Sequence, residues 1–115
     1  MVERVYVEGA GDKGVSAGEN SQVDINEMNI KKSKAGIVSK DLSEVFSVHN
    51  RIEDCDIGYA VYQKKPEYGP ATINILGGET KNIGELYLVE EGSLIVENGT
   101  KFIKGKIKNL AERLL

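Results

Sequence analysis

Residues 36–58, GIVSKDLSEVFSVHNRIEDCDIG, contain the pattern that decides the expected fold. The stretch opens with a glycine and a large apolar residue, passes through a polar bend, and enters a run in which apolar residues alternate. Gly14 opens a similar stretch 22 residues earlier, and Gly58 opens another 22 residues later. Alternation with period two is typical of a strand with one buried face. The sequence therefore predicts a repeated unit of short strands.

Several positions keep the same 22-residue register, and a longer third copy precedes a fourth that opens at Gly84. A unit of this length is too short for a helical pair of about 34 residues and suits a coil of three short strands. Stacked coils would pair each strand in parallel with its copy, at about 4.8 Å per coil. The glycines are expected at sharp bends that favour positive φ. Two expected interior ladders are Val15–Ile37–Tyr59 and Val23–Val45–Ala71, and Ile30, Ile52 and Phe102 are expected to form part of a third.

This pattern resembles the repeat of right-handed parallel β-helix proteins, the pectin-lyase-like superfamily with its carbohydrate-binding and sugar-hydrolase domains. The resemblance covers about residues 11–103, and segments of it are also similar to bacterial surface proteins that carry a spore-coat-H-type kinase domain. It implies an all-β solenoid of about four coils. It implies little about activity, because binders, lyases, hydrolases and inert spacers share the fold. The matching residues are Gly14, Ser21, Val23, Ile30 and Gly36, then Ser43, Val45, Ile52, Cys55 and Gly58.

The chain is expected to form one domain, with coils at about 11–35, 36–57, 58–83 and 84–105. Residues 106–115 read as a short amphipathic helix that caps the last coil, whereas no capping helix precedes the first. An uncapped end exposes strand edges. We therefore expect either a homo-oligomer or a fragment whose neighbouring coils are missing. A fragment of a larger protein would act outside the cell or at its surface; otherwise the sequence predicts no compartment.

Composition excludes several classes of partner. A net charge of −3 argues against nucleic acid, which requires a concentrated basic face. No apolar run approaches the ~18 residues that a membrane span needs, and the N-terminus lacks the features of a signal peptide. Cys55 is the single cysteine, so it forms no internal disulfide and is expected to be a small buried side chain. The sequence predicts no cofactor.

The third copy departs from the pattern at residues 63–70, where Pro66 and Pro70 interrupt regular strand. Loops that protrude from a repeat scaffold are common places for function. Aromatic rings can stack on sugars while charged groups bind hydroxyls or acidic sugars, so this turn is the predicted polysaccharide-binding site. Alternatively, the tyrosines cover the side of the stack and the charges are only solvated. The candidate ligand-binding residues are Tyr62, Lys64, Lys65, Glu67 and Tyr68.

No catalytic or metal-binding residue is predicted. Asp54 and Asp56 could flank a metal or catalytic site, but lysines occupy the corresponding positions one repeat earlier, so an outer lysine–aspartate ladder is the simpler account. His49, the single histidine, has no identifiable triad partner. The expected function is a non-enzymatic β-helix module of a bacterial surface or secreted protein that binds or displays carbohydrate. The alternatives are a fragment of a polysaccharide lyase or hydrolase, and a structural, self-associating spacer.

Overall fold

The computed structural model describes residues 2–3, 6–8, 13–65, 67–108 and 110. Strands make up nearly all of the regular structure within these ranges, as the alternating apolar pattern predicts. They are β1 (Val2–Glu3), β2 (Tyr6–Glu8), β3 (Lys13–Ala17), β4 (Gln22–Asn26), β5 (Asn29–Lys31), β6 (Ala35–Lys40), β7 (Glu44–Val48), β8 (Arg51–Tyr62), β9 (Thr72–Leu76), β10 (Glu79–Val89), β11 (Leu94–Glu97) and β12 (Lys101–Lys104).

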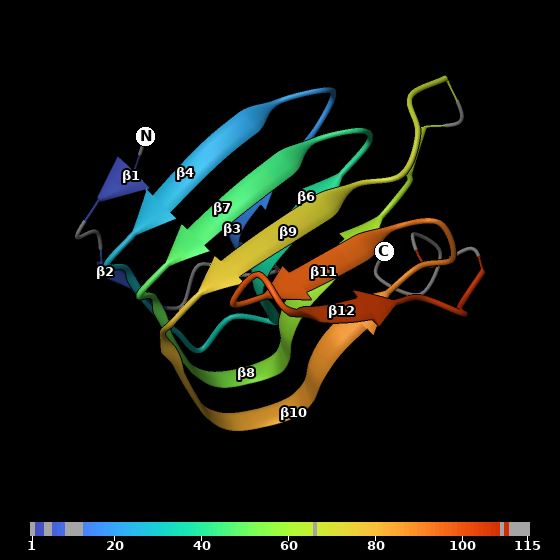
Figure 1. Cartoon of the computed structure of the whole chain (residues 1–115). Coiled ribbons are helices and arrows are strands. Elements are labelled where there is room, and N and C mark those ends of the chain that lie inside the picture. The colour runs from blue at the N-terminus through green and yellow to red at the C-terminus, as the bar shows by residue number, and fades with distance from the viewer. Residues whose placement is uncertain (1, 4–5, 9–12, 66, 109, 111–115) are drawn as a thin grey trace.

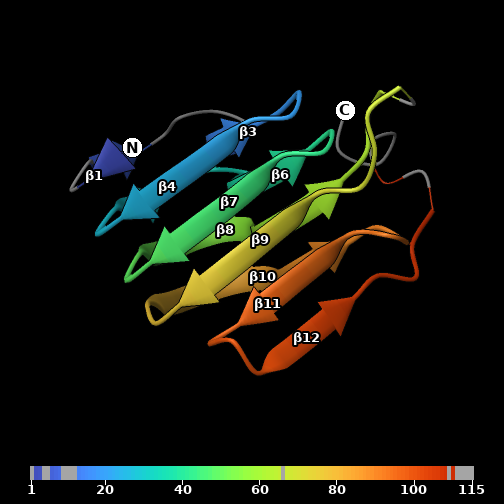
Figure 2. The same ribbon diagram turned by 45° about the horizontal axis from the view of Figure 1, so that its top comes forward.

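The strands form two sheets that curl toward each other like half of a barrel (Figure 1). Sheet A has the order β1-β4-β7-β9-β11-β12, and these strands lie nearly flat beside one another (Figure 2). Sheet B has the order β2-β5-β8-β6-β3, and β10 pairs with β8. The long strands β8 and β10 bend as curved bands beneath sheet A (Figure 1). Each bend coincides with a residue in the left-handed region, Asp54 at φ 55° and Asn82 at φ 56°.

The predicted right-handed parallel β-helix with a capping helix is wrong. The chain forms two sheets with mixed pairing, because the turn at Asn98 and Gly99, both with positive φ, sends β12 back antiparallel to β11. Within the predicted cap at residues 106–115, residues 106–108 are not helical, whereas Leu110 is helical. Ile107 forms a parallel bridge to Glu90, and Leu110 is fully buried. Residues 109 and 111–115 of that predicted helix lie outside the described residues.

Strand pairing keeps the 22-residue register only through the first three copies. Ile37 lies opposite both Val15 and Tyr59, as predicted for the first ladder. In the second predicted ladder Val45 pairs with Ile73 instead of Ala71. In the third, Ile52 pairs with Thr80 in sheet B, whereas Phe102 lies opposite Val96 in sheet A. The second ladder is wrong because the turn after β8 lengthens the third copy by more than its sequence suggests. The third is wrong because β12, which carries Phe102, belongs to the other sheet.

The repeated glycines serve close backbone approach rather than sharp bends. Gly14 and Gly36 lie within β3 and β6, not at turns. A Cβ on Gly36 would lie 2.8 Å from the carbonyl oxygen of Gly58 and 2.7 Å from Cγ2 of Ile52. Residues other than glycine occupy most of the positive-φ positions, including Asp41 at φ 53°. The expectation that these glycines require positive φ is therefore wrong.

Two apolar clusters hold the fold together. The larger lies between the sheets, and the smaller covers the other face of sheet B, where Leu110 and Ile107 pack against it. Polar contacts close the recurring turns: the Ser43 hydroxyl donates to the carbonyl oxygen of Lys40 at 2.6 Å, and Ser21 makes the same contact with Gly18 at 2.6 Å. Within the described ranges, no helix is long and apolar enough to cross a membrane.

Candidate functional site

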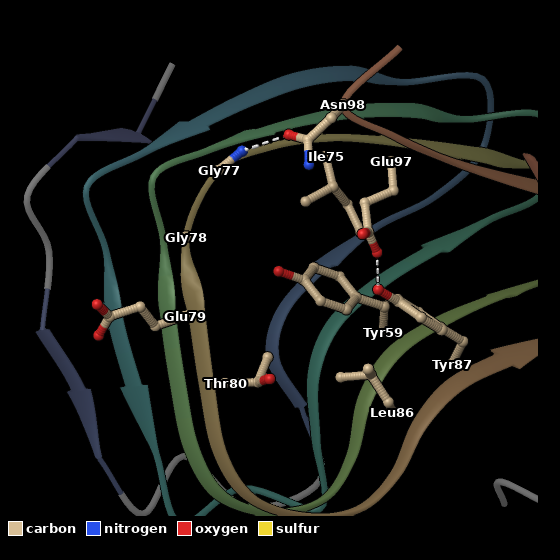
Figure 3. A pocket seen from close by; sticks show the side chains of 10 residues that line it. All are labelled: Tyr59, Ile75, Gly77, Gly78, Glu79, Thr80, Leu86, Tyr87, Glu97 and Asn98. Atoms are coloured by element: carbon tan, nitrogen blue, oxygen red, sulfur yellow. Dashed lines mark hydrogen bonds between the residues drawn. The ribbon is translucent and has the colours of Figure 1, made fainter. Parts of the chain in front are cut away.

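At the end of the structure formed by the last strands, sheet A extends further than sheet B, and this leaves that end open. Sheet A continues beyond β9 through β11 and β12, whereas β10 pairs only with β8 among the described strands. Most of β10 from Glu79 to Leu86 is exposed for this reason. A cleft of about 270 Å³ lies where sheet A extends past the end of sheet B (Figure 3). Its lining residues are Tyr59, Ile75, Gly77, Gly78, Glu79, Thr80, Leu86, Tyr87, Glu97 and Asn98.

Two stacked tyrosines occupy the apolar side of this cleft. The interior ladder that begins with Val15 and Ile37 continues through Tyr59 to Tyr87, because each lies opposite the next in parallel strands. The two phenol rings stack with centroids 5.9 Å apart and planes at 28°. Tyr59 is buried, whereas Tyr87, on the last strand of sheet B, is only half-buried. The ladder therefore ends at the cleft with a partly exposed aromatic ring.

A carboxylate, that of Glu97, is the last member of an interior ladder in sheet A. Ser47 lies opposite Ile75, and Ile75 lies opposite Glu97, so Glu97 occupies the next inward position. The Tyr87 hydroxyl donates a hydrogen bond to Oε2 of Glu97 (Figure 3). Burial, this hydrogen bond and the negative charge of Glu97 all raise the pKa of Tyr87. The phenol therefore stays protonated and serves as a hydrogen-bond donor at neutral pH.

Burial also raises the pKa of the Tyr59 phenol, an effect that a hydrogen bond with the Ser47 side chain partly opposes. In Figure 3, Tyr59, Thr80 and Leu86 point into the open space, whereas Glu79 points away from it. Only one of the two carboxylates among the described lining residues thus faces the cleft. A glycosidase uses a facing pair of carboxylates, and the described lining of this cleft presents one.

The predicted site in the turn at residues 63–70 is organised differently from the expectation. Tyr62 is 2% exposed and belongs to the cluster on the outer face of sheet B, so its ring offers no surface for stacking on a sugar. Oδ1 of the buried Asp41 accepts the backbone N–H groups of Lys64 and Lys65, each at 2.7 Å. The Lys65 ammonium also forms an ion pair with Glu19.

Among the predicted binding residues in this turn, Lys64, Glu67 and Tyr68 are exposed. Tyr68 is 37% exposed, and its N–H donates to the carbonyl oxygen of Lys65 at 3.1 Å, which closes the turn. Of the five predicted residues, three are thus exposed, Lys65 is half-buried and Tyr62 is buried. Ligand binding at this turn stays a prediction.

The acidic segment around Cys55 lies at the surface in the part that the structure describes. Asp54 and Asp56 are exposed on either side of the buried cysteine, and Asn82 donates to Oδ1 of Asp54 at 2.8 Å. Burial raises the pKa of the Cys55 thiol, which makes it a poor nucleophile. Among the described residues, no group of three or more His, Cys, Asp or Glu side chains is placed to hold a metal ion.

His49 lies in the tight turn before β8, at φ 53°, and is exposed. It lines a second, shallow cleft of about 370 Å³ together with Arg51 and Glu79. The Arg51 guanidinium lies 3.1 Å from Oε2 of Glu79, so an acidic partner already neutralises this cation. The second cleft therefore offers little net attraction for an anion.

Sequence reasoning missed the cleft at the open end. Tyr59 was placed in the correct ladder, but Tyr87 and Glu97 were not assigned to any site. The detectable signal is the spacing of 28 residues between Tyr59 and Tyr87, which equals the spacing between Val45 and Ile73. No protein-family model matches this chain, and comparison with curated proteins and with solved structures finds no significant similarity.

Proposed function

We propose that this protein is a non-catalytic carbohydrate-binding module whose site is the cleft at the open end of the two sheets. The observation that carries the proposal is the partly exposed Tyr87 ring, which ends an interior aromatic ladder beside the inward carboxylate of Glu97. An aromatic face suits the apolar face of a sugar ring, and a carboxylate with nearby hydroxyl groups suits its hydroxyls.

The size of the cleft supports a small ligand. Its volume of about 270 Å³ lies just below the range of roughly 300–1,000 Å³ that accommodates drug-sized molecules. Thr80 and Asn98 add polar groups to the lining, while Ile75 and Leu86 add apolar surface. The exposed lining of the cleft is more polar than apolar, which suits a ligand rich in hydroxyl groups. A mono- or disaccharide, free or at the end of a polymer, fits this description.

The experiment compares two single tyrosine variants. Neutral and acidic sugars are titrated into the wild-type protein, Tyr87→Ala and Tyr68→Ala, and binding is followed by isothermal titration calorimetry. Loss of binding in Tyr87→Ala alone supports the cleft, and loss in Tyr68→Ala alone moves the site to the turn at residues 63–70. Absence of binding by the wild-type protein contradicts the proposal. Cleavage of a polysaccharide would instead favour the lyase or hydrolase alternative.

A second candidate function is self-association, which the free edge of β10 favours, because among the described strands β10 pairs only with β8. An exposed strand edge is a template for pairing with another chain. Charges along sheet B also alternate toward this edge: Lys31 lies 3.5 Å from Glu53, and Lys81 is the next residue opposite Glu53. Sedimentation velocity over a range of concentrations tests this candidate, with Leu86→Lys as the variant that adds a charge at the edge. A species that stays monomeric at every concentration contradicts it.

A further inference from the structure

The charges around the cleft indicate which class of sugar it selects, an inference that rests on the proposed function. The described lining residues include two carboxylates and no lysine, arginine or histidine. Of the two, Glu97 faces the open space and Glu79 points away (Figure 3). An anionic sugar entering the cleft would therefore meet a like charge without a compensating cation on its wall.

The nearest cation by strand register is Lys101, which lies directly opposite Glu97 on β12. Lys101 is exposed and is not among the lining residues. An exposed lysine interacts with a neighbouring carboxylate through water and is screened by salt. Glu97 itself is half-buried, so its charge acts more strongly toward the cleft than toward bulk solvent.

We infer that the cleft selects cationic amino sugars, binding the ammonium group at Glu97 and stacking the sugar ring against Tyr87. The Tyr87 hydroxyl donates a hydrogen bond to Oε2 of Glu97. The second carboxylate oxygen, Oε1, can accept a hydrogen bond from an ammonium group. Such a charge-assisted hydrogen bond is roughly twice as strong as a neutral one. The adjacent aromatic face adds a favourable interaction with the same cation.

The relative affinities follow from these contacts. An amino sugar is expected to bind on the order of tenfold more tightly than its neutral counterpart, because a hydrogen bond to a charged group contributes more than one to a neutral group. A uronic acid is expected to bind more weakly than either. Added salt should reduce the preference, since it screens the attraction between ammonium and carboxylate.

The test uses three matched sugars: glucosamine, glucose and glucuronic acid. Each is titrated into the wild-type protein at about pH 6, where a sugar amine is protonated, and binding is followed by NMR chemical-shift changes. The variant Glu97→Gln should lose the preference for glucosamine over glucose. The variant Lys101→Gln, which changes no lining residue, should strengthen glucosamine binding and leave glucose binding unchanged.

The outcomes separate this inference from the proposed function. Equal affinity of the wild-type protein for glucosamine and glucose overturns the inference but leaves carbohydrate binding intact. Tightest binding of glucuronic acid also overturns it. Absence of binding to all three sugars removes the proposed function and the inference with it. If Glu97→Gln fails to fold, as judged by circular dichroism, the salt dependence of the wild-type preference and the Lys101→Gln result decide.

Discussion

The carboxylate of Glu90 accepts the backbone N–H of Leu110 through Oε2 at 2.8 Å. Its other oxygen, Oε1, accepts the N–H of Gln63 at 2.9 Å. Glu90 is buried, and it follows directly after β10. One side chain thus fixes both the start of the turn after β8 and the chain segment after β12 that covers the outer face of sheet B.

Glu90→Gln should loosen this attachment. A glutamine side chain offers one acceptor oxygen, and its amide nitrogen would face one of the two N–H donors. Leaving a buried donor unpaired costs about 1–3 kcal/mol of the free energy of unfolding. Hydrogen exchange should show faster exchange at Leu110 or Gln63, and urea denaturation should show the loss of stability. The exposed neighbour Glu91→Gln is the control, and equal stability of the two variants would contradict this role for Glu90.

Gly36→Ala should destabilise the stack of strands. The added Cβ would lie 2.8 Å from the carbonyl oxygen of Gly58, a backbone atom that cannot move without disturbing the pairing of β6 with β8. Overpacking of this kind costs about 1–3 kcal/mol. Thermal denaturation measures the effect.

The matched control is Gly18→Ala. Its Cβ would meet only side-chain atoms of Lys40, the nearest at 3.0 Å, and this flexible side chain can move. We expect a change in stability well below that of Gly36→Ala. Equal stability of the two variants would show that close approach of the β6 and β8 backbones does not require a glycine at position 36.

The sequence contained enough information to predict strands and their first registers. Val15, Ile37 and Tyr59 share a ladder because apolar alternation and a fixed spacing both survive in the first three copies. Nothing local in the sequence specified how many residues the turn after β8 adds, since a turn can lengthen without changing the strands it connects. The prediction that Ala71 continues the ladder of Val23 and Val45 is wrong for this reason.

The antiparallel pairing of the last strand, β12, could not be predicted for a related reason. Residues Asn98 and Gly99 form a reversing turn, which makes β12 antiparallel, whereas the repeat predicted another parallel coil. The cleft exists only because sheet A continues where sheet B stops. A site formed by the unequal ends of two sheets has no sequence motif of its own, which is why Tyr87 and Glu97 were not assigned to it.

Asn50 is expected to be a strong stabilising residue. Its Oδ1 accepts the N–H of Met28 at 2.8 Å, and its Nδ2 donates to the carbonyl oxygen of Ile25 at 2.8 Å and to Oγ of Ser47 at 2.7 Å. Asn50→Ala would leave buried backbone groups of β4 and the following turn unpaired, at a cost of about 1–3 kcal/mol for each group. Urea denaturation should show a large loss, whereas Asn74→Ala, on the outer face of sheet A, should change little. Similar losses in both variants would contradict the importance of the buried amide.

The tyrosine pair should make stability fall at alkaline pH. Burial raises the pKa values of Tyr59 and Tyr87 above the ordinary value of 10.0. Below about pH 10 both the folded and unfolded states hold the phenol protons, so this contribution to stability is fully present. As pH rises further, the unfolded state releases its protons first, and the free energy of unfolding falls until the folded-state pKa values are passed. Urea denaturation at about pH 9 and about pH 11 measures this fall.

Tyr87→Phe should flatten that alkaline fall, because phenylalanine has no proton to release. The same change removes the hydrogen bond to Glu97 and should lower stability at neutral pH by about 0.5–1.5 kcal/mol. Tyr68→Phe, at an exposed position in the turn at residues 63–70, serves as the control and should leave the pH dependence unchanged. An alkaline fall as steep in Tyr87→Phe as in the wild-type protein would show that Tyr87 does not titrate with unfolding, and would assign the effect to other tyrosines.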